Sequence, residues 1–270
     1  MKPVLVLKLG GELLEQPADL ERMAKGIAAL GRKTKLVVVH GGGKEIDAAL
    51  AIAGIPKQQV DGLRITDAPT LDVVVSVLAG AINTRLVAAV RRAGAKPVGL
   101  TGADAAVATV KRSRPIVSVA GDTVDLGLVG APVGNGRPQL LLDLLKTDYV
   151  PVIACIGATP DGQLMNVNAD TLASHLAQAL GAKRLIIAGG TPGVLDAQGA
   201  TITRLSVRDA QKLIAAGTAN KGMVAKLQAC TAALKRGVGD VLIANGRSIK
   251  FDALSTTRTA PADTTQVVMR

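Results

Sequence analysis

The chain has 270 residues, enough for one large α/β domain or two lobes that share a sheet. Apolar residues make up 48% of the sequence and aromatic residues only 1%, which predicts a core of Val, Ile, Leu and Ala and excludes an aromatic stacking surface for single-stranded nucleic acid. The net charge of +11 is concentrated in residues 201–270, with 11 basic against 4 acidic side chains, and favours a small polyanionic ligand. Nucleic acid is not an expected partner, because no helix-turn-helix, zinc-finger or RNA-binding pattern occurs.

Strand-like and helical segments alternate along the sequence. In the first part we predict a strand over 3–9, a helix over 18–31, a strand over 36–39, helices over 44–53 and 71–90, and a strand over 97–100. Hairpins and loops are expected over 105–137. We then predict a helix over 140–145, strands over 150–156, 185–188 and 241–244, and helices over 170–180, 207–216 and 222–236. This order predicts a three-layer α/β/α sandwich around a central, mainly parallel sheet, with two lobes meeting near residue 180.

The cysteine pattern and the chain start indicate a cytoplasmic protein. Cys155 and Cys230 form no CxxC pair and are interpreted as buried thiols in a reducing compartment. No basic-then-apolar leader precedes the first strand, and no apolar run approaches the roughly 18 residues that a bilayer requires. We therefore expect a soluble protein without a membrane partner.

Glycines follow the first two predicted strands. Gly10 and Gly11 end the first, and Gly41–Gly43 end the second. Ligands of parallel sheets bind where strands turn into helices, and glycine lets backbone N–H groups approach an anion. The alternative is that both clusters are tight turns without a ligand. Neither GxxxxGK[ST] nor GxGxxG occurs, so no P-loop enzyme or dinucleotide dehydrogenase is expected.

Eight motifs, in family order, resemble the amino acid kinase family over essentially the whole chain. They are KLGGELL at 8–14, VHGGG at 39–43, GLRITD at 62–67, LAGAIN ending at Asn83, GLTG at 99–102, GQLMNVNAD at 162–170, PGVLD at 192–196 and KGMVAK at 221–226. GLRITD and NVNAD are similar to the branch that acts on N-acetylglutamate in arginine biosynthesis. The resemblance implies an N-terminal lobe, 1–178, for the acyl amino acid and for dimerisation, and a C-terminal lobe, 179–270, for ATP.

The implied reaction transfers the γ-phosphate of ATP to the side-chain carboxylate of the acyl amino acid. A carboxylate with a pKa of about 4.3 is ionised at neutral pH, so no general base is needed and catalysis rests on positive charge and positioning. By resemblance, Lys8 and Lys226 contact the transferring phosphoryl group and Asp170 holds both lysines. Each also has a plainer interpretation: Lys8 as an edge lysine, Lys226 as a solvated one, and Asp170 as a first-turn acid favoured by the helix dipole.

The remaining site residues also follow from the resemblance. Arg64 and Asn166 match residues that bind the substrate, Arg64 being otherwise a solvated surface residue, and Gly42 and Gly43 would offer N–H groups. The residues expected to bind ATP are Gly10, Gly11, Gly190, Thr191, Gly193, Val194, Leu195, Thr218 and Asn220. Gly190 stands where the family usually carries an aspartate, which puts the nucleotide contacts in question. Mg²⁺ is expected on the phosphates of ATP, with no metal ligands from the protein.

The sequence leaves two alternative activities open and also bears on the oligomeric state. The rivals are a kinase of the same family acting on a carrier-linked or acylated aminoadipate or glutamate, and a nucleotide-binding relative that transfers no phosphate. Arginine-inhibited family members carry an extra helix before the first strand, where this sequence begins. The resemblance therefore implies a homodimer without arginine feedback.

Overall fold

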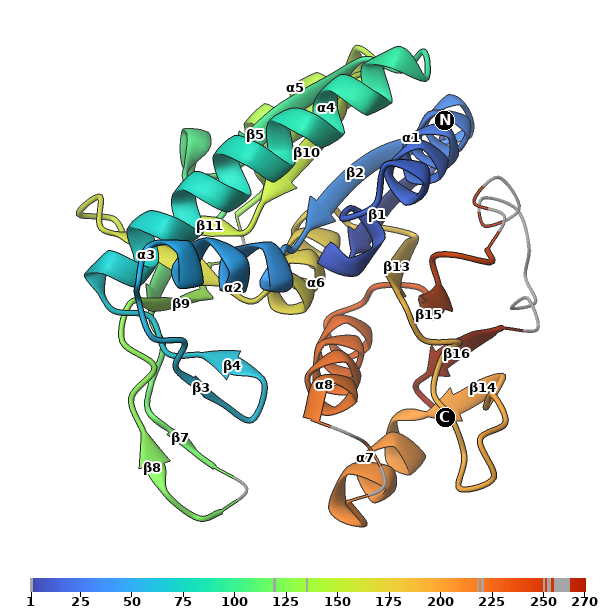
Figure 1. The fold of residues 1–270 in the computed structure, drawn as a ribbon. Helices are drawn as coiled ribbons and strands as arrows, with labels where there is room; N and C mark the ends of the chain where they lie inside the picture. Colours follow the sequence, from blue (N-terminus) through green and yellow to red (C-terminus); the bar gives the residue numbers. More distant parts are fainter. Residues whose placement is uncertain are drawn as a thin grey trace.

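A long, mainly parallel sheet crosses the molecule in the computed structural model, which describes residues 2–118, 120–134, 136–217, 219, 221–249, 251, 254 and 263–270. Its strand order is β14-β16-β15-β13-β1-β2-β10-β5 (Figure 1). The strands of this sheet are β1 Val4–Leu9, β2 Lys35–His40, β5 Pro97–Thr101, β10 Val150–Ala154, β13 Arg184–Gly189, β14 Arg204–Ser206, β15 Val241–Asn245 and β16 Thr264–Val268. The expected parallel sheet is confirmed, apart from the antiparallel pair β15–β16.

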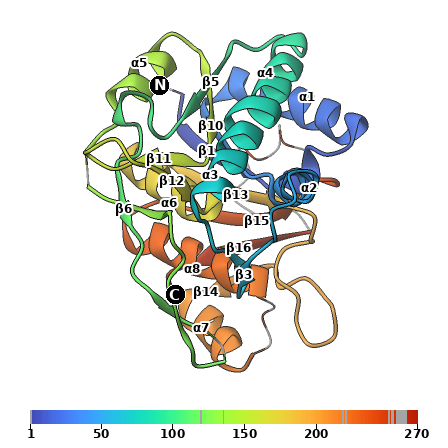
Figure 2. The same ribbon diagram turned by 60° about the vertical axis from the view of Figure 1, so that its left-hand side comes forward.

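Helices cover both faces of this sheet. They are α1 Pro17–Lys33, α2 Gly43–Ile52, α3 Ala68–Val75, α4 Asn83–Arg92, α5 Gln139–Lys146, α6 Ala169–Ala179, α7 Val207–Ala215 and α8 Lys221–Lys235, with short 3₁₀ turns at Gly11–Leu13 and Asp104–Ala106. Helices α1 and α4 pack together on one face, while α5, α6 and α8 pack on the other (Figures 1 and 2). The predicted three-layer α/β/α sandwich is therefore confirmed.

A second, smaller sheet and two ribbons lie beside the first sheet. Their strands are β3 Gln59–Val60, β4 Leu63–Arg64, β6 Val110–Arg112, β7 Ile116–Val117, β8 Thr123–Val124, β9 Val129–Pro132, β11 Ile156–Ala158 and β12 Leu164–Val167. The segment 150–156, predicted as one strand, contributes to both sheets: β10 pairs with β2 and β5, and β11 pairs with β12. The chain changes sheets at Cys155, which the apolar pattern alone does not reveal.

One helical run is long and apolar enough to cross a membrane by length and composition, contrary to our expectation that no such segment exists. Residues Ala68–Arg92 have a mean hydropathy of 1.9 in their most apolar stretch, of which 39% is buried. The run combines α3, a π-helical segment Ser76–Ile82 and α4. One side of it, including Val74, Ile82 and Leu86, packs into the core.

A buried polar network joins this helix to the end of β2. The Asn83 amide donates to Val152 O at 2.9 Å and to His40 Nε2 at 3.1 Å, and His40 Nδ1 lies 3.2 Å from Gly41 O. The neutral tautomer with its proton on Nδ1 satisfies both contacts of His40. Because burial outweighs the hydrogen bond to Gly41, the pKa of His40 is lowered to about 4. His40 is therefore a structural, uncharged residue at neutral pH.

The network predicts that part of the stability depends on pH. Between about pH 6.5 and 4, His40 is protonated in the unfolded chain but not in the folded chain. As the pH is lowered through this range, the free energy of unfolding therefore decreases by up to about 3 kcal/mol. We expect His40→Gln, which still accepts from Asn83, to lose this part of the pH dependence. Urea unfolding of both proteins from pH 7.5 to 4.5 measures it, because the carboxylates cancel in the comparison. Parallel pH profiles would contradict the assignment.

Candidate active site

Four chain segments meet at the carboxyl ends of β13, β1 and β2. The turn after β1 touches the turn after β2 so closely that a Cβ on Gly11 would lie 2.7 Å from Cα of Gly42. A Cβ on Gly42 would in turn lie 2.1 Å from Cδ1 of Ile82, in the π-helical segment. Gly41 faces Ala169 at the start of α6. The contacts of Gly11 and Gly42 leave no room for a Cβ, so these two glycines bring the segments close together.

A buried ion pair lies at this edge. Lys8 Nζ is 2.9 Å from Asp170 Oδ1, and the two side chains are 8% and 9% exposed. Lys8 is flanked in register by Val39 and Ile187, while Asp170 lies in the first turn of α6, whose N-cap is Asn168. Burial alone would lower the pKa of Lys8, but Asp170 and the nearby charge of Glu12 leave that pKa raised above its ordinary value. Lys8 is therefore an ammonium at neutral pH.

The second predicted lysine approaches from α8. Lys226 Nζ lies 3.8 Å from the position that a Cβ on Gly189 would occupy, at the end of β13. Within the described residues Lys226 forms no ion pair, so the structure does not place Asp170 in direct contact with both lysines. Burial raises the pKa of the Cys230 thiol, which the charge of Asp170 raises further and those of Lys226 and Lys8 lower. The charges of all three predicted residues therefore act on this one buried thiol.

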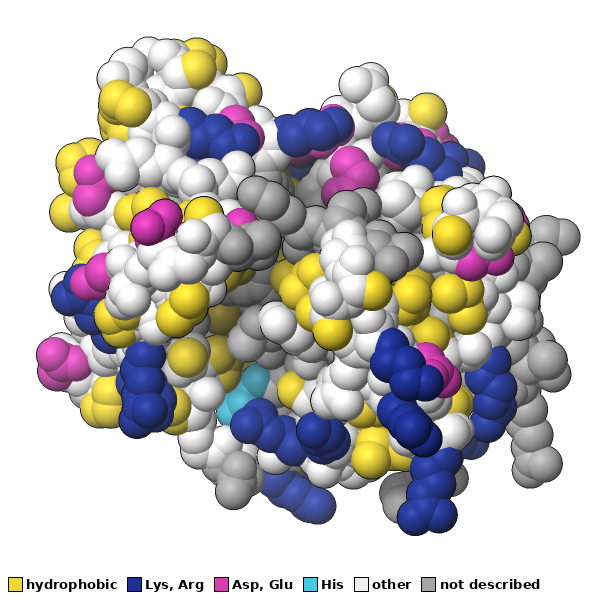
Figure 3. Space-filling view, turned by 90° about the horizontal axis from the view of Figure 1, so that it is seen from below, with side chains coloured by type: hydrophobic (Ala, Val, Ile, Leu, Met, Phe, Trp, Pro, Cys, Tyr) yellow, Lys and Arg dark blue, Asp and Glu magenta, His cyan; other side chains and the backbone are white. Residues whose placement is uncertain are grey.

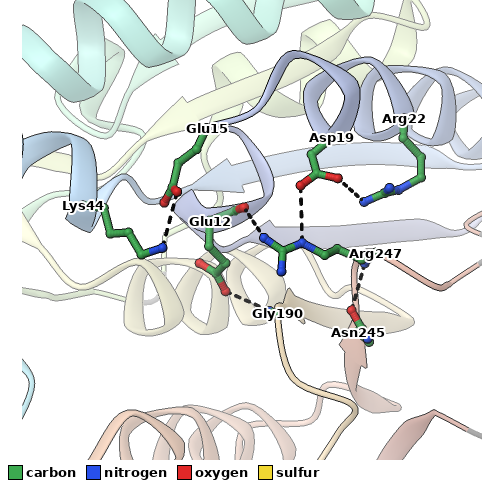
Figure 4. A network of polar contacts seen from close by, with 8 residues as sticks. All are labelled: Glu12, Glu15, Asp19, Arg22, Lys44, Gly190, Asn245 and Arg247. Carbon is green, nitrogen blue, oxygen red and sulfur yellow. Dashed lines mark hydrogen bonds and ion pairs between the residues drawn. The ribbon is translucent and has the colours of Figure 1, made fainter.

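Glu12 also belongs to this cluster, although it was predicted only as part of the KLGGELL motif and without a role of its own. Its Oε1 accepts a hydrogen bond of 2.8 Å from the backbone N–H of Gly190 (Figure 4). The same oxygen lies 3.2 Å from the position that a Cβ on Gly189 would occupy, which Lys226 Nζ approaches to 3.8 Å. The only sequence signal is its place directly after the glycine pair at the end of β1. The partner segment is 178 residues away, and sequence spacing cannot predict such a contact.

Arg64 and Asn166 lie together on the other side of the glycine turns. Arg64 Nη2 donates to Gly43 O at 3.2 Å and to the carboxylate of Asp47. Asn166 Nδ2 donates to Thr66 Oγ1 at 3.1 Å, two residues beyond Arg64. The Arg64 side chain is only 9% exposed, and its buried Nη1 has no hydrogen-bond partner among the described atoms. A buried guanidinium with one free edge is suited to a ligand carboxylate.

Four of the residues predicted to bind nucleotide, Thr191, Gly193, Val194 and Leu195, line one groove. A cavity of about 90 Å³ is lined by Thr191, Gly193, Val194, Leu195, Leu213, Ala219 and Met223. Gly193 has φ +67°, and a Cβ there would lie 2.5 Å from Thr265 Oγ1, so this turn requires glycine. Sequence reasoning missed Leu213, Ala219 and Met223, which come from α7, α8 and their connection. Thr218 and Asn220 lie outside the described residues.

A larger hollow of about 590 Å³ opens beside this cluster, between α6, α8 and the two ribbons. Figure 3 shows a histidine side chain inside a hollow, with Lys and Arg side chains at its rim. His175 and Arg236 line the cavity, and so do Asn168 and Thr171, which flank Asp170. Burial and the charge of Arg236 lower the pKa of His175. Within the described parts of the chain, no three His, Cys, Asp or Glu side chains are placed to hold a metal ion.

Comparisons with known proteins identify the family of the chain. The model of the amino acid kinase family matches residues 3–245. The chain is 46% identical over 241 residues to the acetylglutamate kinase of Sorangium cellulosum, covering 87% of this chain and 84% of that protein. It is 42% identical over 248 residues to the acetylglutamate kinase of Bradyrhizobium diazoefficiens, covering 90% and 84%.

A solved structure shows the same fold. The N-acetylglutamate synthase of Neisseria gonorrhoeae, complexed with coenzyme A and N-acetyl-glutamate, superposes with a TM-score of 0.81 at 25% identity. The match covers 99% of this chain and 60% of the length of the synthase.

Proposed function

The chain belongs to the amino acid kinase family, and from that premise we propose that it transfers the γ-phosphoryl group of ATP to the side-chain carboxylate of N-acetylglutamate, a step of arginine biosynthesis. The observation that carries the proposal is the buried ammonium of Lys8, held by Asp170 at the glycine turns. The two relatives named acetylglutamate kinase favour this acceptor over a carrier-linked aminoadipate or glutamate.

The chemistry needs no proton transfer. A carboxylate oxygen of the acceptor attacks the γ-phosphorus, the bond to the bridging oxygen breaks, and ADP leaves with that electron pair. The product is an acyl phosphate. Two anions must approach each other, so the protein has to supply positive charge to the transferring group. We propose that Lys8 and Lys226 supply it, while Asp170 fixes the position of Lys8.

The acceptor is proposed to bind between Arg64, Asn166 and the start of α2. The unpartnered Nη1 of Arg64 supports this, because a ligand carboxylate would satisfy a donor that is otherwise buried without a partner. Gly42 and Gly43 begin α2, where free N–H groups and the helix dipole favour negative charge. The apolar end of the acceptor would then lie toward Ile82 and Leu78, which face Gly42.

ATP is proposed to lie along the glycines that follow β1 and β13. The groove at Thr191–Leu195 is lined by Leu213 and Met223 and suits a flat, apolar base. The N–H groups of Gly11 and Gly190 would then meet the phosphates, while Gly10 lies beside them with its own N–H donating to Ala188 O at 2.9 Å. We propose that Mg²⁺ binds chiefly to the phosphates of ATP, since magnesium keeps most of its ligands from substrate and water.

We propose that residues 1–178 form the acceptor lobe and 179–270 the nucleotide lobe, and that the protein works in the cytoplasm. The free thiols of Cys155 and Cys230, both buried, suit a reducing compartment. We also propose a homodimer that associates through the outer side of the Ala68–Arg92 helix, where Val73, Val77 and Val87 are only partly buried.

An assay coupled to ADP release tests the reaction. With N-acetylglutamate and MgATP we expect turnover, and Lys226→Met should lower kcat by about a hundredfold or more while leaving the melting temperature nearly unchanged, because Lys226 forms no ion pair with a described residue. Lys8→Met should lower kcat at least as far and also destabilise the protein by roughly 3–5 kcal/mol, because Asp170 loses its partner. Lys235→Met, exposed on the same helix, is the control. A folded wild-type protein without ADP release would refute the assigned acceptor.

The acceptor site is tested at Arg64. Arg64→Lys keeps the positive charge but loses the paired N–H donors of the guanidinium. We expect it to raise the KM for N-acetylglutamate by about tenfold or more, with little change in the KM for ATP. Arg112→Lys, which keeps its charge beside exposed Asp125, is the matched control. Equal effects on the two Michaelis constants would place Arg64 outside the acceptor site.

The assembly is tested separately by light scattering. We expect the mass of a dimer for the wild-type protein and a shift toward the monomer in Ala81→Glu, an exposed position on the proposed interface helix. A monomeric wild-type protein or a hexamer would contradict the dimer without bearing on the reaction.

A further inference from the structure

The carboxylate of Glu12 lies among groups that bind anions. Oε1 accepts from Gly190 N at 2.8 Å and lies 3.2 Å from the Cβ position of Gly189, where Lys226 Nζ approaches to 3.8 Å. Its charge also acts on Lys8. The carboxylate is folded back over Gly10, with an oxygen 2.4 Å from the position that a Cβ there would take. One side chain of the protein therefore covers Gly10 after β1 and reaches Gly189 and Gly190 after β13.

The backbone of Glu12 is fixed, whereas its side chain can move. Leu14 N donates to Gly11 O at 2.8 Å, Leu13 and Leu14 are buried, and Arg247 donates to Glu12 O (Figure 4). The Glu12 side chain itself is only partly buried and reaches Gly190 through a single hydrogen bond. A change of rotamer would uncover the N–H of Gly190 without unfolding the turn.

Gly190 provides the space for this carboxylate. A Cβ on Gly190 would lie 3.4 Å from Glu12 Cγ and 3.7 Å from Oε1. An aspartate at this position, which the resemblance led us to expect, would bring a second carboxylate beside the first, and like charges at this distance repel. The departure from the family pattern at Gly190 and the position of Glu12 are therefore compatible with each other.

We propose that the Glu12 carboxylate is an internal competitor for the phosphate site, which occupies the N–H of Gly190 and the neighbourhood of Lys226 until the phosphates of the nucleotide displace it. Glu12 thereby sets the affinity for ATP. The inference rests on the proposed function, because it takes the phosphate donor of that reaction as the displacing ligand.

Calorimetric titration with ATP, without the acceptor, tests the competition directly. We expect Glu12→Gln to bind ATP about five- to thirtyfold more tightly than the wild-type protein, and Glu12→Ala at least as tightly, because no charge-assisted hydrogen bond has to be broken first. The gain should appear with and without Mg²⁺. Glu15→Gln is the matched control, since Glu15 carries the same charge in the same segment but pairs with Lys44. Thermal melting verifies that each variant is folded.

The outcomes separate the inference from the function on which it rests. Unchanged affinity in Glu12→Gln, or an equal gain in Glu15→Gln, overturns the competition while wild-type turnover leaves the function intact. Weaker binding confined to MgATP also overturns it, because Glu12 would then be a metal ligand. Tighter ATP binding in a protein that phosphorylates no N-acetylglutamate supports the competition and refutes the proposed acceptor.

Discussion

The buried ion pair between Lys8 and Asp170 is the interaction on which the site depends. Removing two charges from water costs several kcal/mol for each, and an apolar pair of similar size would commonly be at least as stable. The pair therefore adds little to stability by itself, yet it holds a charged ammonium at the end of a buried strand. It also joins β1 to α6 through Lys8 and Asp170, which are 162 residues apart in the sequence. The protein therefore retains a pair of charges at a place where apolar side chains would be at least as stable.

Glycines make this arrangement possible by allowing backbones to touch. Gly11 rests on Gly42, and Gly42 rests on Ile82, so the turns after β1 and β2 and the long helix form one continuous contact. The π-helical segment places Ile82 over Gly42, and α4 then begins with Asn83, which anchors His40. A Cβ on Gly11 or Gly42 would have no room. The floor of the site is therefore set by these two glycines and the Ile82 side chain, while the charged side chains stand on that floor.

The sequence predicted what depends on local pattern and left out what depends on long-range pairing. The parallel sheet, the long helix and the position of Lys8 followed from apolar periodicity and from glycines at strand ends. The division of 150–156 between two sheets did not, because β10 and β11 are equally apolar and only their partners differ. Glu12 was missed for the same reason: its partner, Gly190, lies on another strand. Likewise, no pattern places Leu213 or Met223 beside Val194.

The balance of charge explains why carboxylates can occur in the proposed ATP site. Lys8 and Lys226 repel each other before any phosphate arrives, and desolvation makes that repulsion more costly than in water. Asp170 neutralises the deeper lysine permanently, since both groups are nine-tenths buried. Glu12 lies nearer the surface and is held by one backbone N–H, so its carboxylate can move away from the site. In the ligand-free protein, the fixed Asp170 and the movable Glu12 thus offset the charges of the two lysines. The same arrangement restores the positive charge when a stronger anion enters.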